Sequence, residues 1–357
     1  LEVLTTTNEE DGMSGAEGLS ADFIRGRKVI NLDSEAYDEI TVGAAGAYIQ
    51  IAGWKAVRRP VPDGYVTFRI LLNGGLGGHS GVDINKGRCN ANYELCTFLM
   101  TDCGQCLADG GMLVCSIAGG TANASISPVA EVVVAVKEVL ADSLRDTVSE
   151  WNKTLASKYS DTDPDIRAGI GSCDAAGTCL VNGPELIRAV SALPYGVVAM
   201  RDDMPGTVMT SNNIGVIATT DDMLTVSCHT RSFSDDDMHR LGADIAEVFR
   251  ENGSSEVRLL MDTPAWMERE DSPLLALTCS TFNDVLGFEP RKVAMHFVLE
   301  AAYYVRKYPG VEIASIGPLI IEPHSTSERV SLDTADDIWL DPELAQIFLN
   351  LDRRLTC

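Results

Sequence analysis

Apolar residues along the chain alternate between short continuous runs and longer segments with helical spacing. A continuous run at Val29–Leu32 suits a strand buried on both faces of a sheet, and the chain also opens on what reads as a strand, Leu1–Thr7. Glycines interrupt the pattern after each of these runs. The first 46 residues therefore predict two strands of an α/β domain, separated by turns.

Between residues 66 and 170 the pattern predicts a complete supersecondary unit, whose order β-α-β-β-α-β is that of the ferredoxin-like fold. A second, looser set of elements follows. It could duplicate the first, although the two segments share no identity strong enough to establish a repeat. The first set is predicted at Val66–Leu72, Asn85–Met100, Met112–Ile117, Val129–Val136, Lys137–Tyr159 and Ile166–Ile170, and the second at Pro184–Leu193, Val208–Ala218, Met223–His229, Asp235–Asn252 and Glu256–Met261.

After residue 262 the pattern returns to that of an α/β domain. The simplest architecture is one α/β domain built from residues 1–46 and 263–357, with an α+β domain of residues 47–262 inserted between them. Active sites often lie in clefts between such domains. The elements expected in the last segment are a helix over Ser272–Leu286, a strand or turn over Val293–Glu300, a strand over Ile313–Ile316 and a final helix over Ala335–Leu351.

Composition narrows the class of protein. The 357 residues exceed what one ordinary core accommodates, and 28 basic against 52 acidic residues give a formal net charge of −24. Such a charge repels phosphate backbones, so nucleic acid is not an expected partner. No apolar run approaches the roughly 20 residues of a membrane span, so no membrane is expected either.

The cysteines and the first residue also bear on the class. The ten cysteines are scattered, and Cys103-Gly104-Gln105-Cys106 forms half a zinc site without a second half. Reduced, mostly buried thiols and a cytoplasmic location are therefore expected. The chain opens on Leu1 instead of Met, within the expected first strand, which suggests a fragment or a processed form.

Three short stretches place metal-capable side chains at the edges of apolar runs. Glu9-Glu10 follows the first run, Asp33 closes the second, and His324 follows Ile320–Pro323. Carboxylates and imidazoles are the ligands of hydrolytic Zn²⁺ or Mn²⁺ sites, which keep an open position for water. One of two adjacent carboxylates can bind metal while the other takes the proton from that water. The pattern therefore favours a metal-dependent hydrolase.

Four motifs follow one another along the chain: Thr7–Ala16, Ile30–Glu35, Gly77–Ile84, and Ser315–Pro318 running into His324-Ser325. In this order they make the chain similar to the aminoacylhistidine and cytosolic non-specific dipeptidases, among the carnosinase- and aminoacylase-like dinuclear zinc peptidases. The resemblance spans nearly the whole chain and implies a zinc-exopeptidase-like α/β/α catalytic domain in residues 1–46 and 263–357, with an inserted ferredoxin-like lid and dimerisation domain in residues 47–262.

The resemblance assigns roles to the metal-capable residues. Glu9 would be the general base, Glu10 and His324 would bind one of two divalent ions, and Asp33 would bind the other. Zinc is expected, with manganese or cobalt as alternatives. The family's His-x-Asp motif and bridging Asp are absent from this sequence, and a two-metal site needs a shared ligand. The chain alone is therefore expected to be inactive unless a separate segment completes the site.

The resemblance also implies substrate-binding residues. His79 would stabilise the oxyanion of the tetrahedral intermediate, and Arg231 would bind the substrate's carboxylate as a planar bidentate donor. Asn213 would bind the substrate backbone, and His296 and Glu300 would border the substrate. Each of three residues also has a structural interpretation, which stays open. His79 could be an incidental histidine in a glycine-rich turn, Arg231 a surface arginine paired with a nearby aspartate, and Asn213 a turn-forming asparagine.

The leading hypothesis is a homodimeric, metal-dependent dipeptidase. Relatives keep glycines where Val298 and Ala302 stand, so specificity could differ here. An N-acyl amino acid deacylase with the same site is the nearest alternative, because it also cleaves an amide beside a carboxylate. A catalytically inactive relative that serves as a binding or dimerisation module is the alternative from another class.

Overall fold

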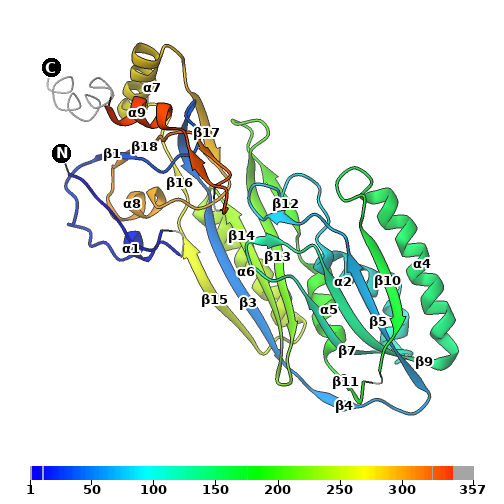
Figure 1. Cartoon of the computed structure of the whole chain (residues 1–357). Coiled ribbons are helices and arrows are strands. Elements are labelled where there is room, and N and C mark those ends of the chain that lie inside the picture. Colours follow the sequence, from blue (N-terminus) through cyan, green and yellow to red (C-terminus); the bar gives the residue numbers. More distant parts are fainter. Residues whose placement is uncertain (1, 10–11, 175, 324, 341–357) are drawn as a thin grey trace. The chain divides into compact units, whose positions relative to one another are not determined.

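The computed structural model describes residues 2–9, 12–174, 176–323 and 325–340. The chain divides into two compact units, each with its own sheet and hydrophobic core (Figure 1). The terminal unit comprises the described residues up to Gly46 together with those from Thr263 onward. The inserted unit extends from Ala47 to Asp262.

The terminal unit contains short strands and helices from both ends of the chain. They are α1 (Ser14–Glu17), β1 (Lys28–Asn31), β2 (Glu39–Ala44), β16 (Trp266–Met267), α7 (Pro273–Leu286), β17 (Arg291–Met295), α8 (Ala301–Lys307), β18 (Glu312–Ser315), β19 (Ile320–Ile321), β20 (Arg329–Val330) and α9 (Leu332–Leu340).

The terminal unit is a three-layer α/β/α arrangement. Its five-stranded sheet has the order β1-β18-β2-β16, and β17 also pairs with β2. Ile313 on β18 belongs to the core that contains α8, whereas the next residue, Ala314, belongs to the core that contains α7. Successive side chains of a strand point to opposite faces, so helices cover both faces of this sheet. The predicted α/β fold class is thereby confirmed.

The inserted unit has longer strands and helices. They are β3 (Gly46–Lys55), β4 (Arg58–Pro60), β5 (Tyr65–Asn73), β6 (Gly78–His79), α2 (Ala91–Thr101), α3 (Gly104–Ala108), β7 (Met112–Gly119), β8 (Ser125–Ile126), β9 (Ala130–Lys137), a 3-10 turn (Glu138–Leu140), α4 (Ala141–Lys158), β10 (Arg167–Ser172), β11 (Thr178–Leu180), α5 (Gly183–Ala192), β12 (Gly196–Met200), β13 (Val208–Thr219), β14 (Met223–Ser232), α6 (Asp235–Glu251) and β15 (Glu256–Thr263).

Two ferredoxin-like units form the nine-stranded sheet of the inserted unit. The predicted one, β5-α2-β7-β9-α4-β10, has the antiparallel order β10-β5-β9-β7. The second, β3-α5-β13-β14-α6-β15, has the equivalent order β15-β3-β14-β13, and β12 adds to β13. The first is inserted between β3 and α5 of the second. The duplication that the sequence left open is thus present in the strand order.

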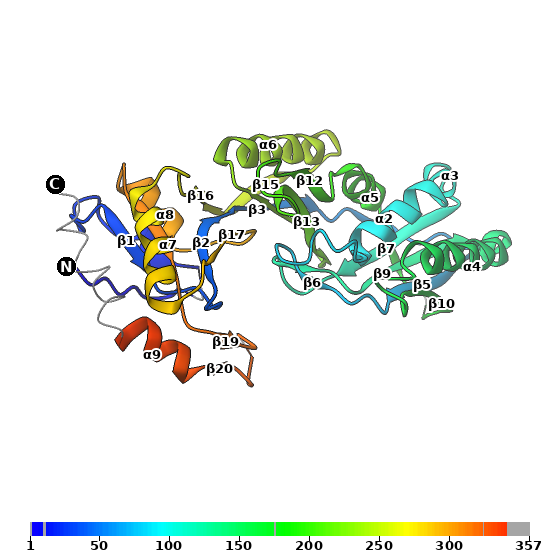
Figure 2. The same ribbon diagram turned by 90° about the horizontal axis from the view of Figure 1, so that it is seen from above.

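One continuous core underlies both ferredoxin-like units. It contains Leu95 of α2, Leu144 of α4, Leu186 of α5 and Leu241 of α6. These four helices therefore cover the same face of the sheet, as Figure 2 shows from above. Among the described residues, no helix combines the length and hydrophobicity that crossing a membrane requires.

The two ferredoxin-like units meet at β7 and β13, where side chains supplement a short ladder. Ile217 pairs with Gly119. The Thr219 hydroxyl accepts a hydrogen bond from the Ile117 amide (3.0 Å) and donates one to the Ile117 carbonyl (2.7 Å). The Asn92 amide donates to the carbonyl of Gly119 (3.3 Å). Polar side chains therefore satisfy backbone groups that a regular strand pair would satisfy itself.

Two predicted elements differ from the structure. The prediction of a strand over Leu1–Thr7 is wrong, because the described residues of this range form no strand. The Glu2 carboxylate accepts hydrogen bonds from the amides of Arg25 (3.0 Å) and Gly26 (2.9 Å). The last helix begins at Leu332, and the remainder of its predicted range lies outside the described residues. The short helix α8 was not predicted.

The substitution Thr219→Val tests the joint between β7 and β13. It keeps the shape of the side chain but leaves the Ile117 amide and carbonyl without their partner, so the free energy of unfolding should fall by about 1–3 kcal/mol. Urea denaturation would measure this loss. The control is Thr101→Val, at an exposed hydroxyl that bonds the Thr97 carbonyl. Equal effects of both substitutions would contradict the prediction.

Candidate functional site

The edge of the terminal sheet where β1 and β18 end carries Asp33. The two strands are parallel, with Asn31 beside Ser315, so both end at the same edge. Buried hydroxyls fasten the residue after Asp33: Ser34 Oγ lies 3.0 Å from both Thr41 Oγ1 and Ser315 Oγ. Ser315 Oγ in turn donates to Asn31 Oδ1 (2.6 Å). The side chain of Asp33 is exposed, so this network holds its backbone while its carboxylate faces outward.

The segment that follows β18 packs directly against Ser34. The Ser34 amide donates to the Ile316 carbonyl (3.3 Å), and a Cβ on Gly317 would lie 1.6 Å from the Ser34 carbonyl oxygen. Only glycine permits this approach. The segment that leads towards His324 therefore begins beside Asp33. His324 itself lies outside the described residues.

Backbone strain in the described residues is concentrated beside predicted site residues. The non-glycine residues with positive φ are Asn8 (59°), Met13 (55°) and Glu322 (54°). The first two flank Glu9-Glu10, and the third lies two residues before His324. The left-handed region is unfavourable for Met and Glu, and such strain often accompanies functional sites. Glu9 is half-buried, and Glu10 lies outside the described residues.

Glu300 links the N-terminal segment to α8. Its carboxylate is buried and accepts hydrogen bonds from the Thr6 hydroxyl and, at 2.9 Å, from the Tyr304 hydroxyl. Burial raises the pKa of Tyr304, and the negative charges of Glu300 and Asp33 raise it further. The structure therefore brings Thr6, Asp33 and Glu300 to one region. Because both oxygens of Glu300 already bind protein hydroxyls, its contacts are those of a structural group.

The metal centre stays a prediction. Across the described ranges, no group of three or more His, Cys, Asp or Glu side chains is placed to hold an ion. Two of the three predicted ligands, Glu10 and His324, fall outside those ranges. The donor types themselves, two carboxylates and an imidazole, suit zinc. His296 follows β17 with a buried side chain, and its substrate-binding role stays a prediction.

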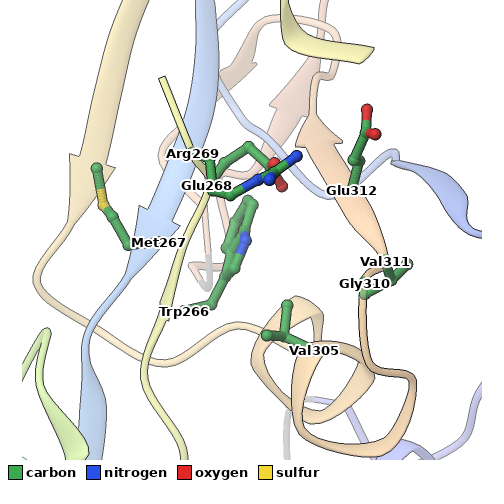
Figure 3. A pocket seen from close by; sticks show the side chains of 8 residues that line it. All are labelled: Trp266, Met267, Glu268, Arg269, Val305, Gly310, Val311 and Glu312. Atoms are coloured by element: carbon green, nitrogen blue, oxygen red, sulfur yellow. The ribbon is translucent and has the colours of Figure 1, made fainter. Parts of the chain in front are cut away.

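A separate cavity of about 290 Å³ lies in the terminal unit (Figure 3). The two carboxylates that line it accept hydrogen bonds from backbone amides: Glu268 from Ile313 (2.7 Å) and Glu312 from Leu274 (2.8 Å). None of the predicted site residues lines it. The lining residues are Trp266, Met267, Glu268, Arg269, Val305, Gly310, Val311 and Glu312.

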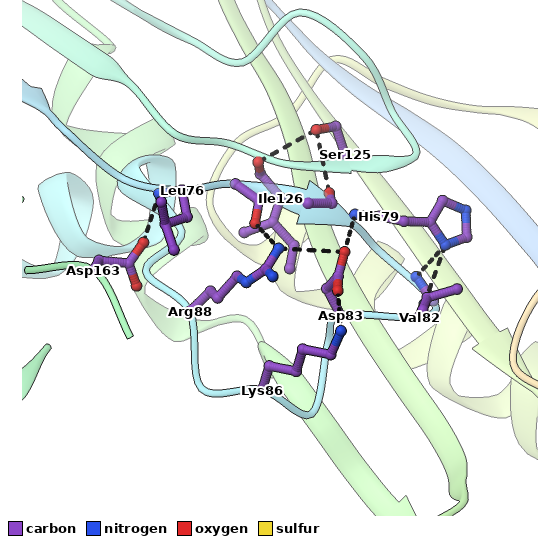
Figure 4. A network of polar contacts seen from close by, with 12 residues as sticks. Leu76, His79, Val82, Asp83, Lys86, Arg88, Ser125, Ile126 and Asp163 are labelled. Atoms are coloured by element: carbon purple, nitrogen blue, oxygen red, sulfur yellow. Dashed lines mark hydrogen bonds and ion pairs between the residues drawn. The ribbon is translucent and has the colours of Figure 1, made fainter. Parts of the chain in front are cut away.

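In the inserted unit, His79 lies on the short strand β6, which pairs with β8 and places His79 beside Ser125. The ring nitrogen Nδ1 accepts hydrogen bonds from the amides of Gly81 (3.2 Å) and Val82 (3.1 Å) (Figure 4). A neutral imidazole whose Nδ1 accepts must carry its proton on Nε2. The loop therefore presents His79 Nε2–H as a hydrogen-bond donor.

Arg231, near the end of β14, is buried, and no carboxylate of the described residues pairs with it. Its Nε and one terminal nitrogen lie 3.4 and 3.3 Å from Ser80 Oγ, and the other terminal nitrogen has no hydrogen-bond partner among the described residues. Burial lowers the pKa of Arg231 to about 9, which still leaves it charged at neutral pH. Burying an unpaired charge is costly. The site therefore favours a bound anion beside Ser80, the residue that follows His79.

Asn213 is fully buried, and its side-chain amide is hydrogen-bonded to other groups of the protein. Its nitrogen donates to the carbonyls of Ser125 (2.8 Å) and Asn123 (3.3 Å), and its oxygen accepts from Asn90 (3.1 Å). Ser125 is the residue paired with His79. These contacts give Asn213 a structural role in holding the loop that carries His79. The substrate-binding role predicted for Asn213 receives no support from them.

Sequence reasoning missed several residues that shape this site. Ser80, Asn90 and Asp83 contact the predicted residues directly. Ser80 and Asp83 lie inside the Gly77–Ile84 motif, so the motif itself was the available signal. Nothing in the sequence pairs Asn90 with Asn213, because they are 123 positions apart.

Comparisons with known proteins give the family. No family model matches the chain. The cytosol non-specific dipeptidase of Escherichia coli (strain K12) is 30% identical over 341 residues, covering 95% of this chain and 69% of that protein. The aminoacylhistidine dipeptidase of Vibrio alginolyticus has a solved structure with a TM-score of 0.86 at 29% identity, covering 96% of this chain and 69% of that one. Aminopeptidase PepT of Bacillus cereus reaches a TM-score of 0.47 at 15% identity, covering 96% and 61%.

The similarities to the two dipeptidases define a class of peptidases with an α/β fold. The chain belongs to the M20 dipeptidase family. The recognition made from the four motifs is therefore confirmed. The roles of individual residues, and of the two units as catalytic and lid domains, stay predictions.

The substitution Gly317→Ala tests the close approach beside Asp33. The added Cβ would lie 1.6 Å from the Ser34 carbonyl, so the two segments must separate. We expect the free energy of unfolding to fall by about 1–3 kcal/mol or more, measured by chemical denaturation. Gly177→Ala is the control, because nothing lies within 4 Å of the added group there. A Gly317→Ala protein as stable as the control would refute this packing.

Proposed function

We propose that the complete protein is a metal-dependent dipeptidase that recognises the free carboxylate of its substrate through Arg231. The observation that carries this proposal is the buried guanidinium, whose only hydrogen-bond partner among the described residues is a serine hydroxyl. A carboxylate supplies both the opposite charge and the geometry for two parallel hydrogen bonds. A site built around a terminal carboxylate favours short substrates over the interior of a long peptide.

His79 supports the same reaction as an electrophilic group. Because Nδ1 accepts hydrogen bonds from the amides of Gly81 and Val82, a neutral His79 ring carries its proton on Nε2, and this proposal assigns that N–H the role of donor to the substrate. A preorganised donor stabilises negative charge as it develops on the carbonyl oxygen, typically by a few kcal/mol. Arg231 on β14 contacts Ser80, and Ser80 is the residue that follows the donor His79. The donor and the anion site are therefore close together. This proximity suits a substrate whose scissile bond lies one residue from its carboxylate.

In this proposal Glu10, Asp33 and His324 hold two divalent ions, zinc first, with manganese or cobalt as alternatives. Bound ions of this kind polarise a carbonyl and acidify water. The Glu9 carboxylate accepts the proton of the attacking water and later delivers it to the leaving amine. The chain spans 69% of the length of the two dipeptidases compared above.

The remaining predicted properties stay part of this proposal. His296 and Glu300 would border the substrate from the terminal unit, and the protein would act as a homodimer in the cytoplasm. The name of the Escherichia coli relative contains the word cytosol, which supports the location. A dipeptide, including the Xaa-His type, is the proposed substrate.

The substitution Arg231→Met tests recognition of the carboxylate. For a free dipeptide, kcat/KM should fall about 10–100-fold because a charged hydrogen bond contributes about 1.5–3 kcal/mol. For the matching dipeptide amide, which lacks the charge, it should change little. Steady-state kinetics on both substrates would measure this. Arg240→Met, which removes an exposed arginine paired with Asp237, is the control. Equal losses on both substrates would contradict the assignment.

The substitution Glu9→Gln in the complete protein tests the general base. The amide cannot accept the proton, so kcat should fall about 10²–10⁴-fold, while metal content measured by mass spectrometry stays unchanged. Glu17→Gln, at an exposed position of α1, is the control. Unaltered turnover would show that another group is the base. Comparing Xaa-His dipeptides with N-acetyl amino acids in the same assay would separate a dipeptidase from a deacylase.

A further inference from the structure

Asp83 and His79 form a reciprocal pair of hydrogen bonds that closes the turn after β6. The His79 amide donates to Asp83 Oδ2 (2.7 Å), and the Asp83 amide donates to the His79 carbonyl (2.9 Å). This is the same logic as a helix capping box, in which side chain and backbone satisfy each other. The side chain of Asp83 is only 14% exposed, so the pair is largely shielded from water.

Two cations hold the Asp83 carboxylate in place, as Figure 4 shows. Lys86 Nζ lies 2.6 Å from Oδ1, and Arg88 lies 3.3 Å from Oδ2. Arg88 also donates to the Gly77 carbonyl (2.7 Å), so it joins the start of the turn to its end. Burial works to raise the pKa of Asp83, but the Lys86 hydrogen bond, the His79 amide and the charge of Arg88 outweigh it and lower the pKa. Asp83 is therefore ionised at neutral pH.

Gly78 leaves room for this arrangement. Its φ is 133°, and a Cβ there would lie 2.3 Å from an Arg88 nitrogen and 2.5 Å from Asp83 Oδ2. Any side chain at this position would displace the cation and the carboxylate together. The glycine before the histidine is thus required by the ion pair as well as by the backbone.

The turn closed by Asp83 holds the His79 ring through its Nδ1. This nitrogen accepts hydrogen bonds from the amides of Gly81 and Val82, which both lie within that turn. If the turn opens, those two amides move and Nδ1 loses the bonds that select its tautomer. A change at Asp83 is therefore transmitted to His79 Nε2 through the backbone, without any contact with substrate.

We propose that Asp83 is a positioning residue for catalysis: by closing the turn it holds His79 in the tautomer and direction that present Nε2–H to the substrate. This inference rests on the proposed dipeptidase function. It assigns Asp83 no contact with substrate or metal. Lys86 and Arg88 assist by holding the carboxylate.

The test is a double-mutant cycle of Asp83→Ala and His79→Ala in the complete protein. Asp83→Ala alone should lower kcat about 10–100-fold and leave KM for the dipeptide within about threefold, because the lost effect is on the oxyanion and not on binding. In the His79→Ala background, Asp83→Ala should have no further effect, because it acts through the histidine. Additive losses in the cycle, or an unchanged kcat, would overturn the proposal.

Nitrogen NMR of the histidine rings supplies a readout that a merely structural role would not move. The His79 signal, assigned by its loss in His79→Ala, should report a single Nε2–H tautomer in the wild type and a mixture in Asp83→Asn. Asp142→Asn, which removes an aspartate that is paired with Arg145 on the exposed surface of α4, is the control for the loss of a surface charge and should leave the signal unchanged. A Nε2–H signal unchanged in Asp83→Asn would refute the positioning role.

Two further comparisons keep the test decisive. If Asp83→Ala fails to fold, Gly78→Ala displaces the same carboxylate without removing it and should reproduce the loss of kcat and the mixed tautomer. A Gly78→Ala protein with the kcat of the wild type and a single Nε2–H tautomer would overturn the proposal. A wild-type protein without dipeptidase activity would reject the proposed function, whereas the tautomer measurement would still decide whether Asp83 positions His79.

Discussion

The pairing of β13 with β7 and with β14 is the constraint on which the inserted unit depends. On one side β13 meets β7 and joins two ferredoxin-like units into one sheet, and on the other it pairs with β14 in a register that sets Ser211 beside Arg231. The same strand carries Asn213, which holds the loop paired with His79. A backbone ladder fixes register, so the guanidinium and the loop are placed by one strand.

The features that point to function are those that cost stability. Arg231 is charged and buried beside one hydroxyl, and Met13 and Glu322 adopt left-handed backbone conformations near predicted site residues. A protein selected for stability alone would replace such groups, and their retention is typical of binding and catalytic sites. The strain at Met13 occurs in the terminal unit and the buried charge of Arg231 in the inserted unit.

Sequence reasoning succeeded where the signal is local. The strands and helices of the first ferredoxin-like unit follow from apolar periodicity, and the four motifs identified the family. It failed where the outcome depends on partners distant in the chain. Leu1–Thr7 has the alternation of a strand, but a strand needs a neighbour, and the described residues supply none. Nothing local pairs Asn213 with Ser125 or with Asn90, so these contacts were not predicted.

The sequence by itself determined the class of protein, the elements of the first ferredoxin-like unit and the residue types available for chemistry, because periodicity, turn residues and motifs are properties of neighbouring positions. The tertiary structure decided that the two halves of the insertion repeat one fold, that Arg231 is buried with no carboxylate partner among the described residues, and that Asp83 closes the turn of His79. Those facts arise from burial and hydrogen bonding between segments that folding brings together, and no local pattern encodes them.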